Sequence, residues 1–141
     1  MINGQHVMDK SNLIEAATVA RLRAYAPYSK FSVGAALLTK SGRVFVGCNV
    51  ENISYRLTMC AEQAAVAAAV AEGELDFVAV AVVADSREPI VPCGACRQVL
   101  AEFNPKMEVV ISSINGSTET LPLNELLPRP AQGILESKRN D

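Results

Sequence analysis

Residues 77–85, FVAVAVVAD, restrict the fold of this chain more than any other stretch, because eight consecutive residues are apolar and four of them are valine. The run is much shorter than the roughly 20 residues that a membrane-spanning helix needs. Short, valine-rich runs without polar residues are typical of strands that are buried on both faces of a sheet. We therefore predict a central strand that other elements cover on both sides.

The segments around this strand alternate between helical and extended patterns. The predicted helices are 11–25, 59–72, 93–103 and a short turn within 121–127. The predicted strands are 31–39, 43–49, 77–84 and 107–113. This order of elements is typical of an α/β layered domain with helices on both faces of one sheet.

Local signals predict where the helices begin and end. Asp9 or Ser11 is expected to cap the first helix, and Pro27 to stop it. Thr58 is the expected cap of the second helix. Pro92 suits the first turn of the third helix, where its missing N–H is no loss.

The size and charge of the chain favour a small cytoplasmic protein. Its 141 residues fit one domain, 1–141, with flexible ends expected at 1–8 and 136–141. The N-terminal residues lack the apolar core of a signal peptide, so a cytoplasmic location is expected, without a membrane partner. The net charge of -2 and the scattered Lys and Arg residues argue against nucleic acid as a partner. In a reducing compartment the four cysteines are expected to be thiols, metal ligands or redox groups rather than disulfides.

Three of these cysteines are expected to meet. Cys93 and Cys96 lie three residues apart at the start of the third helix, and Cys60 lies at the start of the second. Both helices follow segments of the sheet, so their positive ends can point at one place, where they lower thiol pKa values. Zinc prefers thiolate ligands, and three protein ligands leave a fourth position for water, as in catalytic sites. We predict one zinc ion per chain at this place.

Glu62 stands two residues after Cys60 and is expected to reach across the mouth of this site. A carboxylate beside water activated by zinc can take up a proton and pass it to a substrate nitrogen. A purely structural zinc site has no use for such a group. Glu62 is therefore the predicted catalytic residue.

The stretches CAE at 60–62 and PCGACRQ at 92–98 resemble the small zinc-dependent cytidine deaminases with three cysteine ligands. The resemblance continues through residues 24–52 and LNELLP at 123–128, and it covers roughly residues 11–128. It implies a three-layer α/β/α sandwich with a mixed central sheet and a homotetramer. The implied reaction is hydrolysis of cytidine or deoxycytidine to uridine or deoxyuridine and ammonia, a step of pyrimidine salvage, with a pyrimidine nucleoside as the small-molecule partner and Glu62 as the proton shuttle.

The same resemblance implies roles for residues that bind the substrate. Asn49 and Glu51 would hold a ribose hydroxyl, which suits two polar side chains that lie two apart at a strand end. Phe31 and Tyr55 would line the nucleoside pocket. Ala61 would contact the pyrimidine through its backbone.

Two positions depart from the family pattern. Gln63 stands where many members have an arginine that hydrogen-bonds the thiolates, so the site is expected to have less positive charge nearby. In many members an aromatic residue follows LLP, but here the segment is RPAQGIL, residues 129–135. An aliphatic residue such as Ile134 would replace it, which leaves the preference for cytidine, deoxycytidine or a modified nucleoside open.

Other interpretations remain at this point. Cys93 and Cys96 alone would also fit a thiol-redox protein, although Cys60 and Glu62 would then have no role. Blasticidin S deaminases, which act on a cytosine-bearing antibiotic, share both cysteine stretches. Cys48 is expected to be a small buried hydrophobe rather than a fourth ligand. Arg97 either faces solvent or offsets the thiolate charge.

Overall fold

The computed structural model describes residues 9–131, so the expected flexible ends and Ile134 lie outside the described residues. Five strands form one sheet in the order β2-β1-β3-β4-β5. The β3 and β4 pair is parallel and the other three pairs are antiparallel, which confirms a mixed sheet. The strands are β1 (Val33–Thr39), β2 (Val44–Cys48), β3 (Phe77–Ala84), β4 (Glu108–Ser113) and β5 (Thr118–Pro122).

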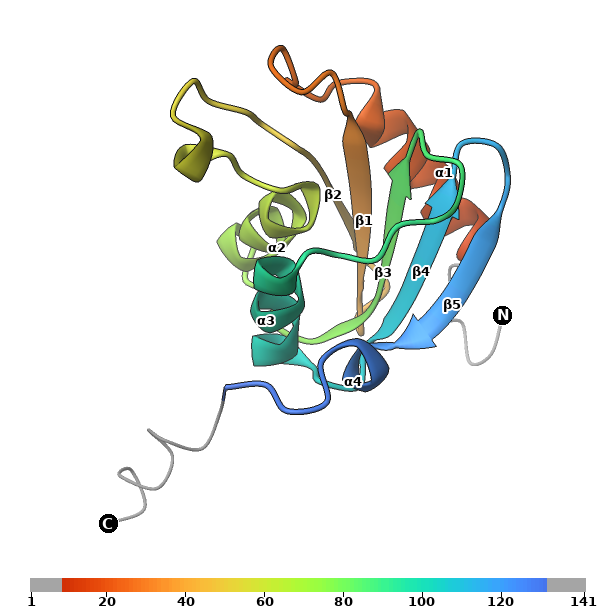
Figure 1. The fold of residues 1–141 in the computed structure, drawn as a ribbon. Coiled ribbons are helices and arrows are strands. Elements are labelled where there is room, and N and C mark those ends of the chain that lie inside the picture. Colours follow the sequence, from red (N-terminus) through yellow and green to blue (C-terminus); the bar gives the residue numbers. More distant parts are fainter. Residues whose placement is uncertain (1–8, 132–141) are drawn as a thin grey trace.

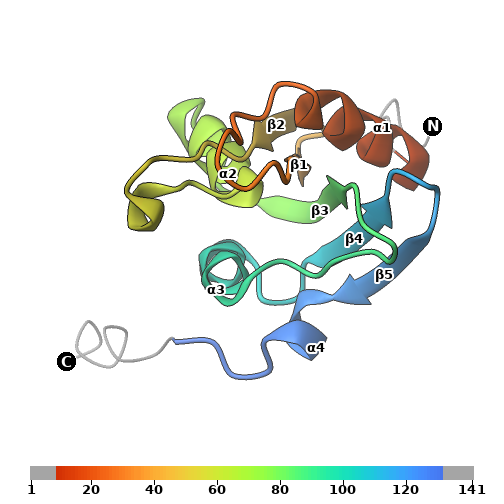
Figure 2. The same cartoon turned by 45° about the horizontal axis from the view of Figure 1, so that its top comes forward.

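Helices cover both faces of the sheet, as the sequence predicts (Figures 1 and 2). One face carries α1, and the other carries α2 and α3 side by side. The helices are α1 (Lys10–Arg21), α2 (Ala61–Ala71), α3 (Gly94–Phe103), α4 (Leu123–Leu126) and the short 3₁₀ helix η1 (Tyr55–Leu57). The three-layer α/β/α architecture is thus confirmed. Within residues 9–131 no helix combines the length and apolar character that crossing a membrane requires.

The central strand β3 explains the apolar run in the sequence. Its side chains alternate between two cores, one on each face of the sheet. Val80 and Val82 pack in the core beneath α2 and α3. Ala81 and Val83 pack in the core beneath α1. A strand with a helical layer on each face has no position for a polar side chain, so the run is apolar throughout.

Two predicted boundaries of α1 and α2 are wrong in an informative way. Helix α1 ends at Arg21, well before Pro27, because Tyr25 has left the helix to form a bridge with Val50. A tertiary contact therefore ends the helix before the proline does. The cap of α2 is Cys60 and not Thr58, which lies two residues before the cap.

The sequence prediction lacks the edge strand β5. Its residues Thr118–Pro122 include three polar side chains and end in proline, so they show no apolar run. The strand forms because β4 offers it a free edge, and the two pair from Ser112 to Glu108. Edge strands with one face in solvent often have such weak patterns.

Gly47 lets α2 approach the sheet very closely. A Cβ atom at this position would lie 2.3 Å from the carbonyl oxygen of Ala61 and 2.5 Å from the amide nitrogen of Ala65. Only a residue without a side chain therefore fits between β2 and the first turn of α2. Because Cys60 caps that turn and Glu62 belongs to it, the glycine sets where they stand relative to the sheet.

Candidate metal centre and active site

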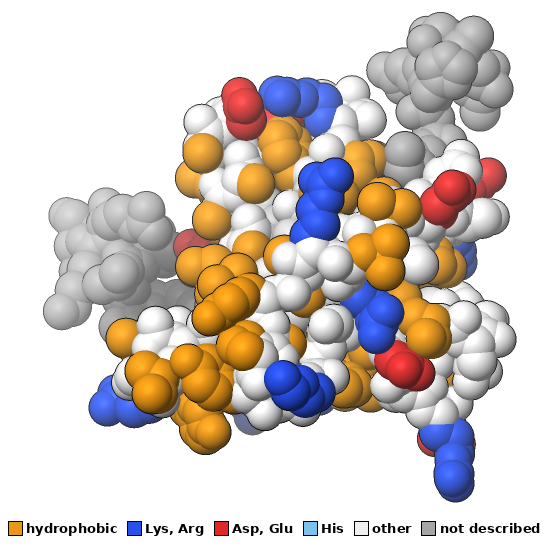
Figure 3. Space-filling model, turned by 90° about the horizontal axis from the view of Figure 1, so that it is seen from above, with side chains coloured by type: hydrophobic (Ala, Val, Ile, Leu, Met, Phe, Trp, Pro, Cys, Tyr) orange, Lys and Arg blue, Asp and Glu red, His pale blue; other side chains and the backbone are white. Residues whose placement is uncertain are grey.

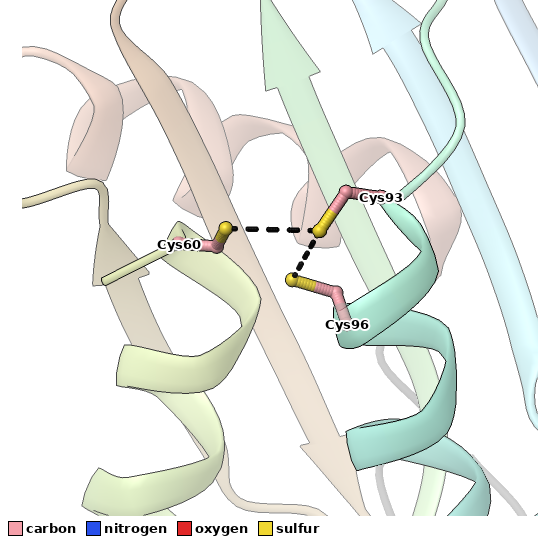
Figure 4. A group of neighbouring side chains, drawn as sticks. All are labelled: Cys60, Cys93 and Cys96. Atoms are coloured by element: carbon pink, nitrogen blue, oxygen red, sulfur yellow. Dashed lines mark hydrogen bonds between the residues drawn. The ribbon is translucent and has the colours of Figure 1, made fainter. Parts of the chain in front are cut away.

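Three cysteines meet where α2 and α3 begin (Figure 4). Cys60 caps α2 and Cys93 caps α3, both with extended backbone angles. Cys96 lies in the first turn of α3. The sequence predicts all three in first turns; instead, two of them are caps, and Pro92 lies just before α3. Neither capping thiol hydrogen-bonds a backbone N–H of its own helix, so both sulfurs are available to the cluster.

The sulfur atoms are spaced as zinc ligands would be. The Sγ atoms of Cys60 and Cys93 are 3.8 Å apart, and those of Cys93 and Cys96 are 3.4 Å apart. All three lie within 4.8 Å of one another. Sulfurs that share a tetrahedral zinc at about 2.3 Å are separated by about 3.8 Å. All three cysteines are free thiols, so the donor set fits zinc.

The thiols strongly influence one another's ionisation. The pKa of Cys60 is lowered to about 6, chiefly by its interaction with the nearby thiol of Cys96, while burial opposes the shift. The pKa of Cys96 is raised, first by its interaction with Cys60 and then by burial. The cluster thus ionises at one sulfur easily and resists further negative charge. A divalent cation is what would let all three act as thiolates.

Glu62 lies beside the cluster in the first turn of α2. Its side chain is only 4% exposed. Burial raises the pKa of its carboxyl group to about 7, and the negative charge of Cys60 adds to this. Such a carboxyl can both accept and release a proton at neutral pH, which general acid–base catalysis requires.

A cavity of about 220 Å³ opens onto this group of residues. It contains three predicted site residues besides the cysteines: Asn49, Ala61 and Glu62. Its walls combine polar groups from α2 with apolar side chains of the sheet and of the loop before α3. The lining residues are Val33, Asn49, Thr58, Cys60, Ala61, Glu62, Val82, Ile90, Val91 and Cys93.

Two of the three other predicted substrate residues lie next to this cavity. Glu51 and Tyr55 line a neighbouring hollow of about 280 Å³, together with Tyr28 and Ser29. Thr58 lines both spaces, so they adjoin. Phe31 is partly exposed and lines neither of them.

Gln63 and Arg97 lie near the thiols, but neither brings a positive charge to the sulfur atoms. The amide of Gln63 donates to the Sγ atom of Cys96 at 3.5 Å, so the group that contacts this sulfur from α2 is neutral. The guanidinium of Arg97 donates to the carbonyls of Pro92 at 2.7 Å and Leu126 at 3.1 Å. Arg97 therefore links backbone segments and is not turned to the sulfurs.

Cys48 lies apart from the metal cluster and half-buried, rather than buried as the sequence predicts. It borders a groove of about 530 Å³ between α1 and β2. In the described part of the chain, the group of possible metal ligands consists of Cys60, Cys93 and Cys96. A four-cysteine site is therefore not formed.

Comparison with known proteins decides the family. The sequence profile described as the cytidine and deoxycytidylate deaminase zinc-binding region matches residues 8–113. The chain belongs to this deaminase family. A cytidine deaminase of Halalkalibacterium halodurans is 52% identical over 122 residues, which are 86% of this chain and 92% of the relative. That of Sporosarcina psychrophila is 50% identical over 122 residues, 86% of this chain and 90% of the relative.

The fold agrees with that of solved members of the family. The crystal structure of cytidine deaminase from Burkholderia pseudomallei aligns with a TM-score of 0.85 and 50% identity, covering 88% of this chain and 100% of that one. The cytidine deaminase from Mycobacterium tuberculosis aligns with a TM-score of 0.78 and 42% identity, covering 90% of this chain and 100% of that one. The resemblance of the sequence to zinc-dependent cytidine deaminases is thus confirmed.

Several residues around this deaminase site carry no signal in the sequence. Ile90 and Val91 line the cavity from an irregular loop, and Thr58 lies between the two hollows. Tyr28 and Ser29 reach the site from a segment more than 20 residues before Glu51. These residues reach the site because of the course of irregular loops, and hydrophobic periodicity in the sequence does not predict the course of a loop.

Proposed function

We propose that this protein hydrolyses cytidine and deoxycytidine to uridine and deoxyuridine. Water supplies the oxygen at carbon 4 of the pyrimidine, the bond from carbon 4 to the amino group breaks, and ammonia leaves. The observation that carries the proposal is the cluster of three thiols beside a buried carboxyl group whose pKa is near neutrality. Relatives at about 50% identity named cytidine deaminase support it.

Each residue of the site has a role in this proposal. Cys60, Cys93 and Cys96 would hold zinc, which when bound acts as a Lewis acid and makes water a better nucleophile. A carboxylate oxygen of Glu62 takes a proton from the attacking water. It passes this proton to the ring nitrogen. It then takes the second proton from the hydroxyl group that the water has become on carbon 4 and passes it to the amino group, so that a carbonyl forms and ammonia leaves. Burial of Glu62 suits this task, because it keeps the pKa near the pH at which both transfers occur.

The nucleoside would lie across the two adjoining hollows. In this arrangement the base faces Ala61 and Glu62 in the inner cavity, and the sugar lies toward Glu51 in the outer hollow. Asn49, which lines the inner cavity, would border the sugar, and Phe31, which lines neither hollow, would contact the nucleoside only at the rim of the pocket. Tyr55, which is 74% exposed on η1, would close the outer side.

We further infer a homotetramer and a cytoplasmic location. Large apolar side chains crowd the segment that leads to α2, and Figure 3 shows hydrophobic side chains gathered on this end of the molecule. Exposed apolar patches of this kind usually mark interfaces between proteins. The exposed residues are Val50, Ile53, Tyr55, Leu57 and Met59. A reducing compartment would keep the three thiols available for metal.

One assay tests the function and its alternatives. The purified protein is incubated with cytidine, deoxycytidine, cytosine and blasticidin S, and deamination is followed by ultraviolet absorbance. We expect turnover of both nucleosides and one zinc per chain. Turnover of blasticidin S alone would favour the antibiotic as substrate. A metal-free protein with a Cys93–Cys96 disulfide under reducing conditions would favour the thiol-redox alternative.

The oligomeric state is tested separately by light scattering during size-exclusion chromatography. A mass of four chains would support the tetramer. A single-chain mass would contradict it. Replacing Leu57 by Asp should then lower the mass of the assembly, because a charge would enter an apolar contact.

A further inference from the structure

The loop between α1 and β1 is tied to Glu51 by three hydrogen bonds. The backbone N–H groups of Tyr28 and Ser29 donate to Oε1 of Glu51 at 3.0 and 3.1 Å. The hydroxyl of Ser29 donates to Oε2 of the same carboxylate. Both carboxylate oxygens are therefore held by one short segment of the chain.

The hydroxyl of Ser29 has a second partner. It accepts a hydrogen bond from the backbone N–H of Phe31 at 3.0 Å. A serine hydroxyl carries a single proton, and here that proton goes to Glu51 while an oxygen lone pair faces Phe31. Ser29 thus connects Glu51, which is expected to hold the sugar, with Phe31, which is expected to line the nucleoside pocket.

The backbone between these partners has an uncommon conformation. Lys30 has φ of 62°, and it is the only residue other than glycine with a positive φ among residues 9–131. This conformation costs energy for a side chain with a Cβ atom, and it persists where surrounding contacts enforce it. The hydrogen bonds of Ser29 on both sides of Lys30 are such contacts.

Asn49 fixes the other end of the same loop. Its side-chain nitrogen donates to the carbonyl of Phe31 at 2.8 Å, and its oxygen accepts from the backbone N–H of Val33 at 2.9 Å. Asn49 is buried, so these bonds are shielded from water. Phe31 is consequently held at its N–H by Ser29 and at its carbonyl by Asn49.

Counting acceptor positions shows what remains available on Glu51. An ionised carboxylate has about four lone-pair positions, of which three are filled by Tyr28 and Ser29. The pKa of Glu51 is lowered, with the hydroxyl of Ser29 as the largest cause, so the group stays charged near neutral pH. About one acceptor position is left, which suits one hydroxyl of a bound sugar.

We propose that Ser29 is a positioning residue of the nucleoside site, which holds the Glu51 carboxylate so that its one remaining acceptor position faces a single sugar hydroxyl. This inference rests on the proposed function. Ser29 does not take part in the chemistry at carbon 4. It acts through Glu51 on the affinity for the sugar, and through the N–H of Phe31 on the shape of the pocket.

The test compares Ser29→Ala with the wild-type protein on cytidine. We expect KM to rise about tenfold, as is usual when a hydrogen bond to a charged group is lost, with kcat changed less than about twofold. Zinc content should stay the same. Ser29→Thr, which keeps the hydroxyl, should restore KM. Ser32→Ala is the matched control, because the carbonyl of Ser32 and not its hydroxyl takes part in a hydrogen bond with Arg21.

A double-mutant cycle then asks whether Ser29 acts through Glu51. If it does, Ser29→Ala should add less than about twofold to the KM of Glu51→Gln. If the increases in KM of the two single variants multiply in the double variant, the residues act independently and the proposal is overturned. An unchanged KM in Ser29→Ala would also overturn it. Should Ser29→Ala fail to fold, Ser29→Cys keeps the size but weakens the hydrogen bond, and its KM must rise as well. A wild-type protein that does not deaminate cytidine would instead contradict the proposed function.

Discussion

The carboxyl group of Glu62 combines burial with a pKa near neutrality. Replacing it by glutamine keeps the size and removes the ability to carry a proton. We expect Glu62→Gln to bind zinc and fold normally while kcat falls by about 10²–10⁴, the usual contribution of a general acid–base group. Steady-state kinetics with cytidine measures the fall in kcat, and metal analysis measures the zinc that is retained. Near-native turnover would show that another group moves the proton.

Glu51 makes stability depend on pH at the acidic end. Its pKa lies below the ordinary value of 4.5 in the folded protein because Ser29 and Tyr28 donate to the carboxylate. A lowered pKa stabilises the fold above about pH 4.5, and this contribution is lost as the pH falls through the lowered value. The Tm of the wild type should therefore drop more steeply between pH 5 and 3 than that of Glu51→Gln. Parallel curves in thermal unfolding scans would contradict this.

Gln63 offers a way to test how a neutral donor serves the thiol cluster. Its amide is 3.5 Å from the sulfur of Cys96. Gln63→Ala should lose zinc to a chelator about 10–100 times more readily, the usual effect of removing a group that supports a metal ligand. Gln63→Arg should retain zinc at least as well as the wild type, because a charge-assisted bond is stronger.

Gln98→Ala is the matched control for this prediction. Gln98 lies on α3 and bonds with the backbone of Ala131, so its loss removes an amide near the site without removing a partner of a thiol. If both glutamine changes had equal effects on zinc retention, the role of Gln63 would be general stability of the helices.

At the level of residues, the meeting of Cys60 with Cys93 was predictable, because both stand where a helix begins beside the sheet. The role of Arg97 was not. Its two acceptors are backbone carbonyls 5 and 29 residues away. Because every residue has a backbone carbonyl, the sequence does not mark which ones Arg97 will bind. Ser29 was missed for a similar reason, since its link to Glu51 spans 22 residues.

At the level of elements, α2 is placed by the close contact at Gly47. Gly47→Ala would put a methyl group 2.3 Å from the carbonyl of Ala61, which the backbone cannot accept without moving. We expect a loss of about 1–3 kcal/mol in the free energy of unfolding, the usual cost of overpacking. Zinc content should fall as well, since Cys60 precedes the displaced turn. Urea unfolding and metal analysis measure the two effects.

Gly94→Ala is the control for Gly47→Ala. A Cβ atom on Gly94 meets no other atom within 4 Å, although this residue begins α3 between two ligands. Alanine also favours helix over glycine, so the variant should be as stable as the wild type or slightly more stable. A loss in Gly94→Ala equal to that in Gly47→Ala would mean that the contact with α2 is not the cause.

The elements with strong periodicity were predicted well, and those that depend on neighbours were not. Strand β3 and helix α3 lie close to their predicted ranges because buried faces fix their sequences. Strand β5 exists because β4 leaves an edge open, and its polar residues give no sign of it. The early end of α1 at Arg21 is likewise set by the pairing of Tyr25 with Val50.

At the level of the whole molecule, α3 joins the cysteine cluster to the C-terminal part of the chain. Arg97 bonds with Pro92 just before the first ligand of α3 and with Leu126 at the end of α4. Arg97→Met should lower the free energy of unfolding by about 1–3 kcal/mol, because two partly buried carbonyls lose their donors. It should also speed the loss of zinc to a chelator. Arg87→Met, at an exposed loop position, should leave both unchanged.

The attachment of Ala131 to Gln98 has a practical consequence for anyone who produces this protein. Ala131 is fixed at both its N–H and its carbonyl on the helix that carries Cys93 and Cys96. A purification tag or fusion partner joined after residue 141 therefore begins only ten residues from a point beside the metal helix. One joined before residue 1 leads instead into α1, on the opposite face of the sheet. Because imidazole is itself a zinc ligand, a histidine tag is better placed before residue 1 than after residue 141.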